Sequence, residues 1–287
     1  MSKIILSADS TCDLGDELKG RYDVHYYPFH IIFKGQDYQD NVDIFPETLH
    51  KAYYEDKSLP QTSAINVQEY VDYFAPFVEQ GYEVIHLNLG SAISAAHEHC
   101  KIAASKFERV YAIDSQSLST GIALQIIRAG DLIEAGWSAK DIVAEIESMR
   151  GRTHASFILD TLDFMAAGGR CPSVLAFASS ALSLKPEIVV DNADGSMSMG
   201  KIYRGKLERV LEKYIRATVA KYPDIICDHI FLTHSGVDDA VCQKMKALVE
   251  ELLPAENIHI TQASCTIASH CGPGTLGILF VTETPSK

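Results

Sequence analysis

Short apolar runs alternate with longer stretches of helical spacing along the first half of the chain, and this alternation limits the fold more than any other feature of the sequence. Helices are predicted over residues 94–106 and 119–135, with apolar positions on one face. The predicted strands cover residues 4–8, 24–27, 31–33, 83–89 and 109–113. Strand–helix alternation is typical of a parallel sheet covered by helices. We therefore predict a three-layer parallel α/β domain.

The pattern changes after Gly151-Arg152, which ends a predicted helix. Residues 188–190 and 197–203 are predicted strands on either side of Asp194-Gly195, a pair that favours a β-hairpin turn. A hairpin joins antiparallel strands, so the second sheet should be mixed. We predict two domains, residues 1–151 with the parallel sheet and residues 152–287 with the mixed sheet.

The charge of the chain narrows the classes of ligand. The formal net charge is −13, and so acidic a surface repels nucleic acids and anionic membranes. The apolar run at residues 4–6 is too short for a signal peptide, and no stretch reaches the length of a membrane helix. Seven scattered cysteines without a Cys-x-x-Cys pair fit reduced thiols. We therefore expect a cytoplasmic protein without a nucleic-acid partner or stable membrane insertion.

Hydroxyl-rich segments follow the predicted strands of the first half. They are Asp9-Ser10-Thr11, Ser91 to Ser94 and Asp114 to Ser117, and a further pair, Thr62-Ser63, precedes a predicted helix. Ligands of parallel sheets bind beyond the carboxyl ends of the strands. Ser94 stands where a strand passes into a helix, and free backbone amides at such a point favour anions. The alternative is that Ser94 is only an N-cap, which stabilises a helix by about 1 kcal/mol.

Histidine and arginine in glycine-rich turns are further candidates. His270 lies where a helical stretch meets Gly272-Pro273-Gly274, and its ring could bond an anion or merely its own turn. Gly168-Gly169-Arg170 follows another helical run, and its arginine either follows a helix C-cap or faces a cleft or partner. Arg204, after the hairpin, is equally ambiguous.

Three other motifs resemble known chemistry but lack its context. Residues 272–277 match a dinucleotide fingerprint, yet they run into a predicted strand and not a helix. His97 and His99 are two residues apart on a predicted helix and face different ways, so no shared metal is expected. Ser235 follows His234, but no nucleophile elbow occurs in the sequence.

Taken in order, these segments resemble the DegV family of bacterial fatty-acid-binding proteins. The resemblance extends from about residue 3 to residue 282. The matching segments are Asp9-Ser10-Thr11-Cys12-Asp13-Leu14, Thr62-Ser63, Ser91 with Ser94, Asp114-Ser115, Ser119 with Gly121, Asp160-Thr161-Leu162, Gly168-Gly169-Arg170, Leu184-Lys185-Pro186, Asp194-Gly195 and His270 with Gly272-Pro273-Gly274. The chain departs from the family at Ala64-Ile65-Asn66 and at Ala95-Ala96-His97.

The resemblance implies a carrier that holds a long-chain fatty acid in a tunnel between two domains. It implies that Thr62, Ser94 and His270 bind the carboxylate, with Ser63, Ser115 and Arg170 in support. It implies no metal, no cofactor and no catalysis by the chain itself. In some members a separate fatty acid kinase phosphorylates the bound carboxylate, which suggests Arg170 and Arg204 as partner-facing residues.

A second function stays open on the sequence alone. The family fold resembles the substrate domains of dihydroxyacetone kinases, in which a histidine holds a small carbonyl compound. That alternative predicts a small polar pocket, whereas a fatty acid carrier needs a long apolar one. A pure interaction module would have neither.

Overall fold

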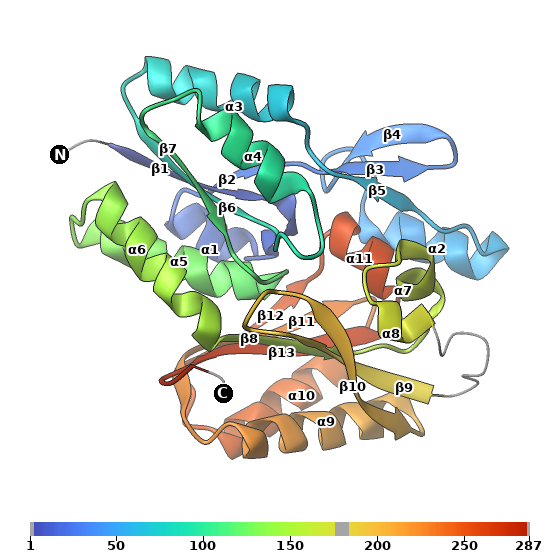
Figure 1. The fold of residues 1–287 in the computed structure, drawn as a ribbon. Helices are drawn as coiled ribbons and strands as arrows, with labels where there is room; N and C mark the ends of the chain where they lie inside the picture. The colour runs from blue at the N-terminus through green and yellow to red at the C-terminus, as the bar shows by residue number, and fades with distance from the viewer. Residues whose placement is uncertain (1–2, 176–183, 286–287) are drawn as a thin grey trace.

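The parallel sheet predicted for the first half is present. The computed structural model describes residues 3–175 and 184–285 and contains a four-stranded parallel sheet of order β2-β1-β6-β7 (Figure 1). Its strands are β1 (Ile4–Asp9), β2 (His25–Tyr27), β6 (Glu83–Asn88) and β7 (Val110–Asp114). Because they are parallel, the carboxyl ends of β1, β6 and β7 lie at one edge of the sheet.

The second half forms a six-stranded mixed sheet of order β10-β9-β8-β13-β11-β12. Only β11 and β12 pair in parallel; the other neighbours are antiparallel. The strands are β8 (Thr153–Ile158), β9 (Leu184–Val190), β10 (Met197–Arg204), β11 (Ile225–Ser235), β12 (Asn257–Gln262) and β13 (Thr275–Thr282). The predicted hairpin is confirmed, with Gly195 at φ 79° in the loop between β9 and β10.

Helices separate and cover these two sheets in layers (Figure 1). Helices α3 (Val67–Glu79) and α4 (Ala96–Ala104) cover the outer face of the parallel sheet, while α5 (Thr120–Glu134) and α6 (Ala139–Met149) cover its inner face. Helices α9 (Leu207–Lys221) and α10 (Asp239–Leu252) lie on the outer face of the mixed sheet. Helix α5 packs between the two sheets, with Ile122 and Ile126 fully buried. The predicted α/β class, parallel sheet first and mixed sheet second, is confirmed.

A third sheet was not predicted. Strands β3 (His30–Phe33), β4 (Gln36–Gln39) and β5 (Gln61–Ser63) form an antiparallel sheet of order β4-β3-β5. The strand predicted over residues 31–33 is present as β3, but it pairs in this antiparallel sheet and not in the parallel sheet. The reason lies in Lys34 and Gly35, at φ 49° and 78°, which form a two-residue turn that reverses the chain at once.

Short helices join this third sheet to the second half of the chain. They are α2 (Pro46–Asp56), α7 (Asp163–Gly168), α8 (Pro172–Leu175) and α11 (Cys265–Cys271). The remaining short elements are α1 (Asp16–Arg21) and the 3-10 turns Ser10–Cys12 and Arg150–Arg152. Cys265 of α11 is buried in a small core with Ile31 and Leu49. We refer to the parallel sheet, the three-stranded sheet and their helices as the N-terminal lobe, and to the mixed sheet with its helices as the C-terminal lobe.

Among the described helices, none is long and apolar enough to cross a membrane.

Candidate functional site

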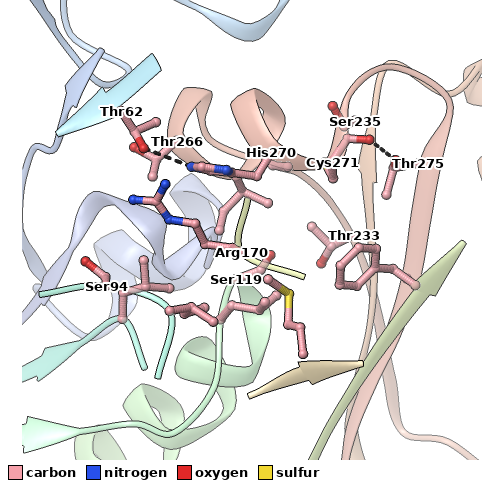
Figure 2. Close-up of a pocket in the computed structure, with 18 of the residues that line it drawn as sticks. Thr62, Ser94, Ser119, Arg170, Thr233, Ser235, Thr266, His270, Cys271 and Thr275 are labelled. Carbon is pink, nitrogen blue, oxygen red and sulfur yellow. Dashed lines mark hydrogen bonds between the residues drawn. The ribbon is translucent and has the colours of Figure 1, made fainter. Parts of the chain in front are cut away.

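A cavity lies between the carboxyl ends of the parallel strands and the inner face of the mixed sheet. It contains about 960 Å³ of space between protein atoms, including the part open to solvent. The N-terminal lobe contributes Thr62 of β5, Ser94 from the segment after β6, and Leu118 before α5. The C-terminal lobe contributes residues of α11 and β13 (Figure 2).

Most of the cavity wall is hydrocarbon. Nine large apolar side chains line it, from segments of both lobes: Phe29, Leu89, Ile93, Leu118, Phe157, Met165, Met197, Ile267 and Leu279. Two of the nine are methionines, whose flexible thioether side chains adapt to ligands of varied shape. A wall of this kind binds an apolar ligand through burial and offers little to a small polar one.

Four further hydroxyls in the wall are already bonded to the protein. They belong to Ser119, Thr233, Ser235 and Thr275. Ser119 donates to Asp13 Oδ2 at 2.5 Å, and Thr275 donates to the carbonyl oxygen of Cys271 at 2.9 Å. Thr233 Oγ1 lies 2.6 Å from Thr120 Oγ1, and Ser235 Oγ lies 2.9 Å from His50 Nε2. These residues therefore do not make this part of the wall a strong polar site.

One part of the cavity brings together groups that can hold an anion. Thr62 Oγ1 lies 2.8 Å from His270 Nε2, and this contact joins β5 to α11 (Figure 2). Burial, with a smaller effect from the Arg170 guanidinium, lowers the pKa of His270 to about 4. The ring is therefore neutral near pH 7 and carries one N–H.

Ser94 lies just before α4, which begins at Ala96, two residues later than predicted. Its Oγ accepts a hydrogen bond from the backbone N–H of Ala96 at 3.2 Å. Because this bond uses Ser94 as an acceptor, its own O–H remains able to donate. The N-cap of α4 is Ala95, so Ser94 is not the N-cap that one interpretation of the sequence required; it supports the first turn from one residue earlier and lines the cavity.

Arg170 supplies the positive charge. It is the one lysine or arginine among the described residues that line the cavity, and its guanidinium points toward Thr62 in Figure 2. One guanidinium nitrogen donates to the carbonyl oxygen of Gly168 at 2.7 Å. The guanidinium has five N–H donors, so most of them remain for another acceptor.

The structure does not bring the other predicted residues to the cavity. Ser63 follows Thr62 on β5, and successive residues of a strand face opposite sides, so Ser63 is exposed to solvent. Ser115 is buried and closes its own turn by donating to the carbonyl oxygen of Ser117 at 3.2 Å. Arg204 ends β10 and is exposed outside the cavity wall. Neither Ser63 nor Ser115, predicted as supporting residues, lines the cavity.

A serine–histidine–aspartate chain exists, but outside the cavity. Ser7 Oγ lies 2.8 Å from His86 Nδ1, and His86 Nε2 lies 3.0 Å from Asp9 Oδ1. All three residues are 0% exposed, and none lines the cavity. Asp9 also accepts from the backbone N–H of Leu89 at 2.9 Å. The array therefore fastens the ends of β1 and β6, and its hydroxyl cannot reach a substrate.

The histidine motifs noted in the sequence have local partners. His97 Nδ1 lies 3.3 Å from Asn88 Oδ1, whereas His99 Nδ1 lies 2.7 Å from the carbonyl oxygen of Ile65, so the two rings face different neighbours. Ser235 contacts His50 of α2 and not the adjacent His234. The turn at residues 272–274 leads into β13 and not into a helix.

Fold and cavity together define a class, the two-lobed α/β proteins with a mainly apolar ligand cavity between their sheets. Within that class the sequence matches one family model over residues 3–283, described as "Uncharacterised protein, DegV family". The chain belongs to the DegV family. The resemblance stated from the motifs is therefore confirmed.

Relatives of known sequence and structure match almost end to end. A DegV domain-containing protein of Clostridium perfringens is 28% identical over 290 residues, which is 99% of this chain and all of that protein. A Thermus thermophilus DegV family structure, described for fatty acid binding, has 28% identity and a TM-score of 0.88, with 98% of this chain and 99% of that one covered. A stearic-acid-binding protein of Eubacterium ventriosum has 25% identity and a TM-score of 0.79, with 99% of each chain covered.

Proposed function

We propose that this protein binds a long-chain fatty acid in the cavity and carries it with the carboxylate held near Thr62. The observation that carries the proposal is the grouping of Thr62, His270 and Arg170 in one part of a cavity whose wall is otherwise mostly apolar. An amphiphile with one anionic end matches that division. The overall charge of −13 would repel such a ligand at long range, so local donors must supply the attraction.

The head group would be held by hydroxyls as well as by charge. If His270 Nε2–H donates to Thr62 Oγ1, the Thr62 O–H is left to donate to a carboxylate oxygen. Ser94 accepts from Ala96 and can donate in the same way. Each hydrogen bond to a charged group contributes about 1.5–3 kcal/mol. Arg170 adds a cation with several free donors.

The tail would supply most of the affinity. Each buried methylene contributes roughly 0.8 kcal/mol, so a chain of about fourteen methylenes gives on the order of 10 kcal/mol before ordering costs. Phe157, Met197 and Leu279 are side chains that the tail would contact. The hydroxyls of Ser119, Thr233, Ser235 and Thr275 already have partners within the protein, so a tail beside them leaves none of these four unpaired.

The relatives support the same ligand class. Two structures with at least 25% identity to this chain are described for fatty acid or stearic acid binding. The alternative, an enzyme or subunit for a small carbonyl compound, requires a compact polar pocket. The apolar wall disfavours that alternative, and we propose a carrier with no catalysis of its own.

We further propose that the carrier presents the carboxylate to a separate kinase in the cytoplasm. Arg170 is exposed as well as lining the cavity, so it could contact both ligand and partner. Arg204 is exposed at the end of β10 and would add to the contact surface. The ligand would then lie between two domains, residues 1–151 and residues 152–287.

Native mass spectrometry of the purified protein tests the proposed ligand. We expect an adduct with the mass of a long-chain fatty acid, lost on delipidation and restored by added palmitate. A small polar adduct would favour the carbonyl-compound alternative. Protein that carries no adduct and gains none with palmitate would contradict fatty acid binding.

A further inference from the structure

Helix α11 (Cys265–Cys271) begins in contact with two carboxylates from the other lobe. The first backbone N–H groups of any helix lack partners within the helix and need an acceptor. A helix usually takes that acceptor from its own N-cap side chain. Here the N-cap is Ser264, and its side chain makes no capping hydrogen bond. The acceptors come instead from Asp13 and Asp40.

The contacts are short and cover three successive amides. Asp13 Oδ1 accepts from the backbone N–H of Ser264 at 2.8 Å. Asp40 Oδ1 accepts from the N–H of Cys265 at 2.8 Å, and its Oδ2 accepts from the N–H of Thr266 at 3.2 Å. Both aspartates belong to the N-terminal lobe, so this capping is contact between lobes.

Each carboxylate is itself fixed in place. Ser10 donates to Asp40 Oδ2 at 2.8 Å, and Ser119 donates to Asp13 Oδ2 at 2.5 Å. Asp13 and Asp40 are 6% and 1% exposed. Burial raises the pKa of Asp13 to about 7 and raises that of Asp40 as well. Two buried acids are a costly way to begin a short helix, which suggests that the position of the helix matters.

The same helix forms a wall of the cavity. Thr266, Ile267, His270 and Cys271 of α11 all line it. The helix has 7 residues, about two turns, so it moves as one rigid piece. A shift of its first turn therefore shifts His270 in its last turn. The 2.8 Å contact between His270 and Thr62 requires both ends to be held.

We propose that Asp40, with Asp13, is a positioning residue for the fatty acid site, holding α11 against the N-terminal lobe so that His270 meets Thr62. The inference rests on the proposed function for its effect on binding. Neither carboxylate would touch the ligand. Both would act through the helix that carries His270.

Asp40→Asn tests the inference with little change in shape. The asparagine side chain keeps one acceptor oxygen, but its amide nitrogen would face a backbone N–H of α11, where donor meets donor. We expect palmitate binding to weaken about 10-fold or more, because a charged hydrogen-bond network is broken. In a His270→Gln background the same change should weaken binding by less than about 3-fold, since residues in one network are not additive.

A second readout needs no fatty acid. The readout is the pKa of the His270 ring in ring-nitrogen NMR spectra, in which the His270 signal is assigned by its loss in His270→Gln. In Asp40→Asn this pKa should rise from about 4 toward the ordinary value near 6.5, because water reaches the ring. Asp43→Asn is the matched control, because Asp43 is an exposed carboxylate of the same segment that accepts a hydrogen bond from the backbone N–H of Gln39 and not from α11. It should leave both readouts unchanged.

The outcomes separate the two proposals. If Asp40→Asn does not fold, Ser10→Ala removes one support of Asp40 and should give the same changes on a smaller scale. An unmoved His270 titration, or a loss of affinity equal in both backgrounds, would overturn the positioning role. Failure of the unmodified protein to bind palmitate would instead overturn the proposed function and leave the NMR result to decide the role of Asp40.

Discussion

Replacing Thr62 and Ser94 together by alanine should weaken palmitate binding by about 100-fold or more. Each hydroxyl donates one charge-assisted hydrogen bond in our account, worth about 1.5–3 kcal/mol, and a factor of ten in affinity corresponds to about 1.4 kcal/mol. The tail contacts would remain, so residual binding is expected. Calorimetry with delipidated protein measures the change.

The adjacent residue offers a matched control for this experiment. Ser63 has the same β5 backbone as Thr62 but faces solvent, so Ser63→Ala should bind palmitate like the unmodified protein. Thr62→Ser keeps the hydroxyl and should retain most of the affinity. An unchanged Kd in the double variant would show that the carboxylate is held elsewhere.

Gly168→Ala should cause a second large loss of binding, although the residue touches no ligand in our account. A Cβ at Gly168 would lie 2.2 Å from His270 Nδ1 and 2.9 Å from Cε1. The ring is held by Thr62 on its other side, so it can yield only by breaking that contact. We expect binding to fall about 10-fold or more, with about 1–3 kcal/mol lost from the free energy of unfolding through overpacking.

The effect should depend on the histidine. In a His270→Ala background the clash disappears, and Gly168→Ala should then be neutral or slightly stabilising, because alanine favours helix more than glycine does. Gly20→Ala in α1 is a control for the substitution itself, since nothing lies within 4 Å of a Cβ there. Equal losses with and without His270 would contradict this account.

Much of the fold could be predicted because the spacing of apolar residues in the sequence matches the spacing of buried side chains in the structure. The strands β1, β6 and β7 and helix α5 lie within a few residues of their predicted ranges, since each buries an apolar face. Helix α3 runs to Glu79 across Pro76, although a proline inside a helix removes one backbone hydrogen bond and often kinks or ends the helix. Its buried residues Tyr70 and Phe74 supply packing that compensates for the lost hydrogen bond.

The three-stranded sheet escaped prediction for an equally physical reason. Strand β4 is mostly exposed and polar, and β5 has only three residues, so neither carries the alternation that marks a strand. Thr62 was identified by motif, but its orientation was not. Only the register of β5 against β3, with Thr62 opposite Ile31, decides that Thr62 and not Ser63 faces the cavity.

The supports of the site could not be found from the sequence at all. Asp13 and Asp40 lie far from α11 in the chain, and carboxylates in turns are common on any surface. Their role depends on lobe packing, which local patterns do not encode. The closeness of Gly168 to His270 is likewise a tertiary contact between α7 and α11.

A crystal structure of the delipidated protein reloaded with palmitate tests the central claim most directly. We predict one carboxylate oxygen within hydrogen-bond distance of Thr62 Oγ1 and the other near Ser94 or Arg170, with the tail passing Phe157 and Leu279. A fatty acid lying outside the cavity, or inside it with its carboxylate away from Thr62 and Ser94, would contradict the account.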